Sequence, residues 1–197
     1  DELRFLTIVT DLTARKLAEE RKAAVVDAAL DAVVGMDHTG AITEFNPAAE
    51  QTFGYRRADV LGRSMVDVII PPHLRTGHAS GLERYLATGK SPIIGKRIEL
   101  SAMRSDGVEI PVELSVLRVG SGKTPSFVGF IRDISESKRA EQALLERAQV
   151  AALGADVGMA LTTGETIREI LQLACEAVVR HLGAAFTRIW TLNAATH

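Results

Sequence analysis

The sequence predicts an α+β domain: a five-stranded antiparallel sheet with helices over one face, flanked by two long charged helices. Two short apolar strands separated by a turn come first, at about residues 32–46. Short helices bounded by glycine and proline follow, and three segments that alternate polar and apolar residues come last, between residues 97 and 132. Such alternation is typical of strands that bury one face, so these segments predict most of the sheet.

The first two strands are predicted at residues 32–37 and 41–46. His38-Thr-Gly40 lies between them and supplies residue types that favour a hairpin turn. Asn46 is a good helix N-cap, and Pro47 suits the first helical position. Two short helices are therefore expected, Pro47 to Phe53 ending at Gly54 and Arg57 to Leu61 ending at Gly62.

A longer helix is predicted from about His73 to Thr88, because Pro71 and Pro72 precede it and Gly89 follows it. One stripe of this helix has helical spacing and is mostly apolar. Its members are Leu74, His78, Leu82, Tyr85 and Leu86. His78 is the only polar residue near the middle of the stripe.

The last three strands are predicted from alternation. In the first, Ile98, Leu100 and Ala102 oppose Arg97, Glu99 and Ser101. In the second, after a turn at Ser105-Asp-Gly107, Val108, Ile110, Val112, Leu114 and Val116 oppose Glu109, Glu113 and Ser115. The third covers residues 127–132. Each would bury one face against the helices.

An internal repeat indicates the domain organisation. Residues 5–19 and 127–141 share one pattern: an apolar strand, then Asp-Leu-Thr or Asp-Ile-Ser, then a charged helix. Asp133 precedes Glu136 by three residues, the spacing of a capping box, so the strand is expected to pass directly into the helix. Because the chain begins and ends within patterns, we expect it to be a fragment.

Composition excludes several classes of function. The formal net charge is −2 and no basic patch stands out, so we expect no nucleic-acid partner and no membrane contact by this piece. The single cysteine, Cys175, cannot form an intrachain disulfide or a cysteine zinc site, which fits a reducing, cytoplasmic location. No metal site, phosphate-binding glycine motif or catalytic constellation is found, so an enzyme is not expected in this segment.

The middle of the chain resembles the PAS family of sensory domains. The motifs are Phe45-Asn-Pro-Ala-Ala-Glu50, Phe53-Gly-Tyr55, Val60-Leu-Gly62, Arg104-Ser-Asp-Gly107 and Asp133-Ile-Ser135. The resemblance implies a pocket between sheet and helices, a homodimer formed through the flanking helices, and a signal relay at Asp133, Ile134 and Ser135, with Asp11 as the equivalent position in the first copy. It also implies a multidomain parent protein, with a histidine kinase as first choice and a cyclic-dinucleotide enzyme as second.

The C-terminal part resembles the start of a GAF domain. Thr162-Thr-Gly-Glu165 is a candidate capping box, an apolar helical stripe runs from Ile167 to Leu182, and residues 184–193 read as a strand. The predicted organisation is the last strand of a preceding PAS-like domain at 1–10, a linker helix at 11–24, the PAS domain at 25–135, a linker helix at 136–155 and a truncated GAF-like start at 156–197.

His78 is the most specific candidate for a ligand site. The region is similar to the haem-binding PAS domains of oxygen-sensing kinases, which implies that His78 ligates haem iron and that Arg84 pairs with a propionate. One departure is Ile98, which stands where that branch places its oxygen-sensing arginine, while Arg97 alternates to the opposite face. The pocket candidates are His78, Leu82, Arg84, Ile93, Ile94, Ile98, Leu114, Val116 and Phe130.

Three alternatives stay open at this point. His78 also fits a core or helix-surface histidine that is hydrogen-bonded locally, as in cofactor-free PAS domains. The pocket could also hold a colourless small ligand instead of haem. A ligand-free PAS domain that only dimerises and spaces its neighbours is the alternative from another class. A flavin adduct is not expected, because Cys175 lies outside the domain.

Overall fold

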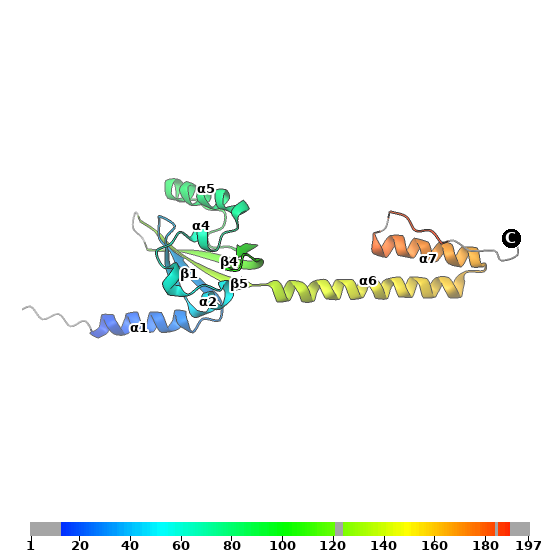
Figure 1. Ribbon diagram of the computed structural model, residues 1–197, viewed down its shortest axis with the longest axis horizontal. Coiled ribbons are helices and arrows are strands. Elements are labelled where there is room, and N and C mark those ends of the chain that lie inside the picture. The colour runs from blue at the N-terminus through cyan, green and yellow to red at the C-terminus, as the bar shows by residue number, and fades with distance from the viewer. Residues whose placement is uncertain (1–12, 121–123, 184, 190–197) are drawn as a thin grey trace, which may run out of the picture. The chain divides into compact units, whose positions relative to one another are not determined.

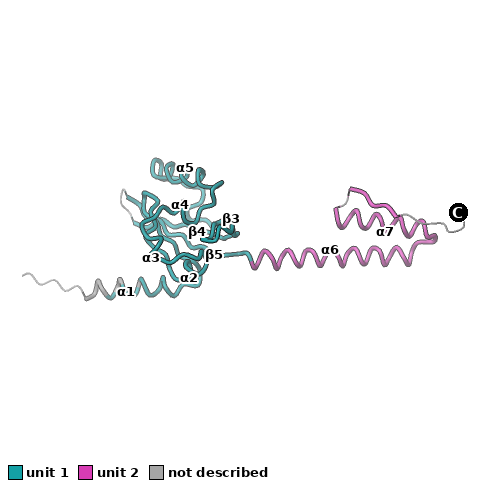
Figure 2. Tube along the Cα trace, in the orientation of Figure 1, with its two compact units in different colours: residues 1–135 teal, residues 136–197 magenta. Residues whose placement is uncertain are grey.

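The computed structural model describes residues 13–120, 124–183 and 185–189. The chain divides into two compact units, residues 1–135 and 136–197 (Figure 2). The strand predicted at residues 1–10 and the junction residue Asp11 lie outside the described residues. None of the helices described combines the length and apolar character that a bilayer span requires.

The first unit contains a five-stranded sheet (Figure 1). The strand order is β2-β1-β5-β4-β3, and every neighbouring pair is antiparallel. The strands are β1 (Ala32–Met36), β2 (Ile42–Phe45), β3 (Arg97–Met103), β4 (Glu109–Val119) and β5 (Ser126–Asp133). The predicted fold class is confirmed. Val108 is an exception to the predicted alternation, because it precedes β4 and is 51% exposed.

Helices connect the first hairpin to the last three strands. They are α2 (Pro47–Phe53), α3 (Arg57–Val60), α4 (Met65–Val68) and α5 (Pro72–Thr88), and α1 (Thr13–Asp27) precedes the sheet. Helix α4 was not predicted, since four residues are too few to show a helical period. Helix α3 ends at Val60 rather than Leu61, and Gly62 follows with a φ of 79°.

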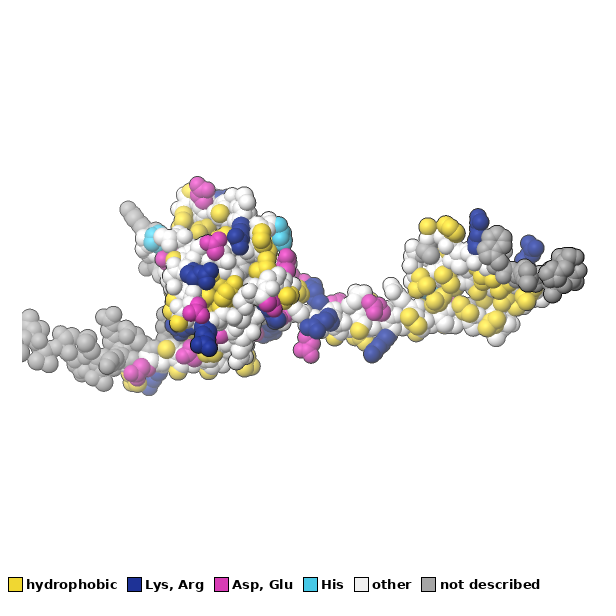
Figure 3. Space-filling view, in the orientation of Figure 1, with side chains coloured by type: hydrophobic (Ala, Val, Ile, Leu, Met, Phe, Trp, Pro, Cys, Tyr) yellow, Lys and Arg dark blue, Asp and Glu magenta, His cyan; other side chains and the backbone are white. Residues whose placement is uncertain are grey.

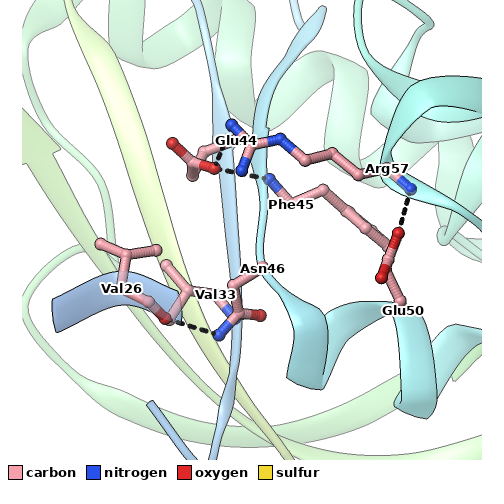
Figure 4. Close-up of polar contacts among 7 residues, drawn as sticks. All are labelled: Val26, Val33, Glu44, Phe45, Asn46, Glu50 and Arg57. Carbon is pink, nitrogen blue, oxygen red and sulfur yellow. Dashed lines mark hydrogen bonds and ion pairs between the residues drawn. The ribbon is translucent and has the colours of Figure 1, made fainter. Parts of the chain in front are cut away.

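Asn46 joins three elements and is fully buried. Its side-chain oxygen accepts hydrogen bonds from the N–H of Val33 in β1 at 2.8 Å and of Ala49 in α2 at 2.9 Å. Its amide nitrogen donates to the carbonyl of Val26 at 3.0 Å (Figure 4) and to the carbonyl of Asp31 at 3.1 Å. Asn46 is therefore the predicted N-cap and also the link between the end of α1 and the sheet.

A second set of polar contacts holds α3 in place. The guanidinium of Arg57 pairs with Glu44 of β2 at 2.8 Å (Figure 4). The carboxylate of Glu50 in α2 accepts a hydrogen bond from the Arg57 backbone N–H at 2.6 Å. These contacts fix the short helices over β1 and β2, where Phe45, Phe53 and Val60 are completely buried.

The second unit contains most of α6 (Ser135–Thr163) and α7 (Ile167–Leu182). Asp156 of α6 accepts contacts from His181 at 2.8 Å and Arg180 at 2.9 Å, both on α7. The hydrogen bond from His181, assisted by the charges of His181 and Arg180, holds the pKa of Asp156 below its usual value. Apolar side chains gather on the surface of this unit (Figure 3).

Three predictions for this unit need correction. Helix α6 continues past residue 155 to Thr163, and in its last turn the hydroxyls of Thr162 and Thr163 donate to the Met159 carbonyl at 2.9 Å. The capping box therefore lies four residues later than predicted, where Thr166 accepts from the N–H of Glu169 at 3.2 Å. Residues 185–189 of the predicted strand are not in a strand, and its other residues lie outside the described part.

Candidate functional site

A cavity of about 360 Å³ lies between the inner face of the sheet and α5. Strand β1 and the three last strands form its floor, α5 and the segment that follows it form a wall, and Met65 of α4 also lines it. The lining is apolar apart from a few side chains, notably His78, Arg84, Ser91 and Ser101. Its volume and composition are those of a small-molecule site.

The inner stripe of α5 faces this cavity. Leu74, His78, Leu82 and Tyr85 all line it, whereas Leu86 does not and is 45% exposed. The ring of Tyr85 meets that of Phe127 in β5 edge-on, with centroids 5.3 Å apart. Although α5 has 17 residues, none of them is fully buried, because much of its inner face borders the cavity.

His78 presents an unpartnered nitrogen within this apolar setting. The side chain is half-buried, and its Nδ1 atom is buried without a hydrogen-bond partner. Burial lowers the pKa of His78, so the neutral imidazole is favoured. A neutral ring nitrogen has a lone pair free to bind a metal or to accept a hydrogen bond from a ligand.

The segment after α5 is held against β4. Ser91 accepts a hydrogen bond from the N–H of Ile93 at 3.2 Å, and the N–H of Gly95 donates to the carbonyl of Val116 at 2.9 Å. Ile94 also forms an isolated parallel β-bridge with Val116. These backbone contacts bring Ile93 and Ile94 to the cavity.

The structure brings together eight of the nine predicted pocket residues. Those that line the cavity are His78, Leu82, Arg84, Ile93, Ile94, Ile98, Leu114 and Val116. Phe130 was wrongly predicted to do so. It is 41% exposed and pairs with Val33 and Ser115, which belong to the outer face of the sheet.

The error at Phe130 is one of strand parity. Phe127, Gly129 and Ile131 are the β5 residues that line the cavity, and Ile131 pairs with Leu114 of the inner face. The register of β5 with β4, which the structure supplies, decides which face of β5 is the inner one. Met65 and Ile69 also line the cavity but come from the unpredicted helix α4 and the residue after it.

The predicted junction lies at the end of β5. Asp133 forms an ion pair with Arg104 at 2.8 Å and accepts from the N–H of Ser135, the first residue of α6, at 2.8 Å. This hydrogen bond joins residues that are two apart in the sequence, whereas the predicted capping box joins residues that are three apart. Partial burial acts to raise the pKa of Asp133, but the contacts with Ser135 and Arg104 outweigh it and leave the pKa below its usual value.

Comparison with known proteins identifies the class of this domain. A family model described as PAS fold matches residues 20–134. The domain has the same fold as a PAS domain from Colwellia psychrerythraea, at a TM-score of 0.50 and 21% identity over 60% of this chain and 98% of that one. The chain therefore belongs to the PAS family, and this part of it is a sensory module.

Relatives among characterised proteins include two sensors. The chain is 34% identical to the sensor protein FixL of Bradyrhizobium diazoefficiens, over 59% of this chain and 23% of FixL. It is 32% identical to the oxygen sensor protein DosP of Escherichia coli, over 46% of this chain and 11% of DosP. An uncharacterized protein of Azorhizobium caulinodans is 41% identical over 65% of this chain and 17% of its own length. The match thus covers only a small part of each relative.

Proposed function

We propose that this PAS domain senses its signal through a haem group held in the cavity, with His78 as the axial ligand. The observation that carries the proposal is the buried, unpartnered Nδ1 of His78 in an apolar cavity. Haem iron commonly takes an axial histidine, and it supplies a site at which a small gas can bind. The similarity to FixL and DosP supports a sensor of this kind.

The other lining residues suit a flat, mostly apolar group with acidic substituents. Leu82, Ile94 and Leu114 would contact its apolar surface, and the guanidinium of Arg84 could pair with a carboxylate at its edge. Ile98 lines the cavity as well, so it would offer an apolar contact where the haem-binding branch has an arginine. We infer that this domain does not distinguish oxygen by a hydrogen bond from that position.

We further propose that ligand binding is relayed through the end of β5 into α6. Asp133 contacts both Arg104, which follows β3, and Ser135, which begins α6, so a shift of the sheet would alter the start of the helix. Ligand binding would then change the populations of two helix arrangements in a homodimer. The parent protein would be a histidine kinase, with a cyclic-dinucleotide enzyme as the second choice.

An ultraviolet–visible spectrum tests the haem site directly. The chain is expressed with haem precursor as the wild type, as His78→Ala and as the control His73→Ala, which changes an exposed histidine on the same helix. We expect a Soret band in the wild type and the control and its loss in His78→Ala. Circular dichroism would check that all three fold alike.

Other results would contradict the proposal. A Soret band that survives in His78→Ala would exclude His78 as the axial ligand. A featureless wild-type spectrum would exclude haem and favour a colourless ligand. The ligand-free alternative requires a filled core, and the cavity argues against it.

A further inference from the structure

Helix α5 has two interior glycines, Gly77 and Gly81, which flank His78. Glycine is the least favourable helix residue apart from proline, because it loses the most backbone freedom on folding. Two glycines one turn apart therefore weaken the helix that carries the candidate ligand.

The usual structural reasons for glycine do not apply at these two positions. Neither is among the glycines with positive φ, and a Cβ atom built at either would meet no atom within 4 Å apart from the adjacent backbone of its own helix. Gly129 in β5 differs, since a Cβ there would lie 3.3 Å from Leu114 Cδ1. Packing is therefore tight at Gly129 but not at either glycine of α5.

Both helix glycines line the cavity. Gly77, Gly81 and Arg84 are spaced i, i+4 and i+7, so they form a row along α5 beside the row that contains His78 and Leu82. Part of the cavity wall is consequently bare helix backbone. Any side chain at Gly81 would extend into open space at this wall.

We propose that Gly77 and Gly81 are specificity-determining residues, which keep one wall of the cavity open so that a broad, planar ligand can lie against the backbone of α5 beside His78. The proposal rests on the proposed function, because it requires a ligand in this cavity. It predicts that a small helix-favouring residue at these positions stabilises the ligand-free protein, whereas a large residue weakens ligand binding.

The experiment compares Gly81→Ala, Gly81→Leu and Gly77→Leu with the wild type by haemin titration and by thermal unfolding without haemin. Ser80→Leu is the matched control, because it adds the same side chain to the same helix at an exposed position that does not line the cavity. Gly81→Ala should raise the melting temperature of the ligand-free chain by roughly 2 to 4 °C, since alanine favours the helix.

Gly81→Leu and Gly77→Leu should weaken haemin binding by about tenfold or more, because their side chains occupy space that the ligand needs. Ser80→Leu should bind like the wild type. Wild-type affinity in both leucine variants at Gly77 and Gly81, or an equal loss in Ser80→Leu, would overturn this inference and leave the haem site standing. A wild type that takes up no haemin overturns the proposed function, and this inference with it.

Discussion

The two halves of the PAS domain differ in how they use the inner face of the sheet. Over β1 and β2, the short helices α2 and α3 fill the space, and Phe45, Ala49 and Phe53 are 0% exposed. Over β3 and β4, α5 has no fully buried residue and encloses a cavity of about 360 Å³. Stability is thus concentrated in the filled half, which leaves the other half free to bind a ligand.

The position of the polar groups follows the same division. In the filled half the buried amide of Asn46 makes four hydrogen bonds, so its desolvation is fully compensated. In the half that contains the cavity, the buried Nδ1 of His78 makes no hydrogen bond. An unpaired buried polar atom costs free energy, which a ligand that bonds to it would recover.

The largest expected effect is the difference between Phe53→Ala and Leu82→Ala. Phe53 is fully buried, with its ring centroid 6.1 Å from that of Phe45, so its truncation should lower the free energy of unfolding by about 3 to 5 kcal/mol. Leu82 borders the cavity, and its truncation creates no new sealed void, so the loss should be about 1 kcal/mol. Urea denaturation followed by circular dichroism measures both, and equal losses would refute the division into two halves.

Asn46 should give the next largest effect. Asn46→Ala leaves the N–H of Val33 and the carbonyls of Val26 and Asp31 without this partner, and should lower the free energy of unfolding by about 2 to 3 kcal/mol. Asn46→Asp separates the accepted hydrogen bonds from the donated ones, because a carboxylate can still accept from the N–H groups of Val33 and Ala49 but cannot donate to the two carbonyls.

Hydrogen exchange distinguishes these two roles. In Asn46→Asp we expect increased exchange at the end of α1 and little change in α2. If exchange at the end of α1 increases no more than exchange in α2, Asn46 acts only as a helix cap and does not hold α1.

The sequence was most informative where local chemistry decides the structure. Asn46, Pro47 and Gly54 specify the start and end of α2 through capping, which depends on neighbouring residues. The alternation of polar and apolar residues in β3 and β4 is also a local pattern, and it predicted that Ile98 and Leu114 face the cavity. Helix α4 was missed because its four residues carry no period.

Features that depend on distant partners could not be predicted. The inner face of β5 depends on its register with β4, and the apolar Phe130 obscured it because both faces of that strand carry large residues. Asn46 was predicted as a cap, but its bonds to Val26 and Asp31 depend on how α1 meets the sheet. The open wall at Gly81 is likewise visible only once α5 is placed over the cavity.

The smallest expected effect concerns Asp133, whose partly exposed ion pair with Arg104 belongs to the end of β5 rather than to either half. Its folded pKa lies below the value near 3.9 expected in the unfolded chain, so its contribution is fully present above about pH 4 and is lost as the pH falls through the folded pKa. Asp133→Asn should therefore cost at most about 1 kcal/mol near pH 7 and should converge with the wild type in acid.

A double-mutant cycle with Arg104→Met separates the ion pair from the hydrogen bond to Ser135, because only the ion pair requires both partners and weakens with added salt. A stability difference between wild type and Asp133→Asn that stays constant from pH 7 to pH 2 would contradict the depressed pKa. It would also show that the charge of Asp133 does not stabilise the start of α6.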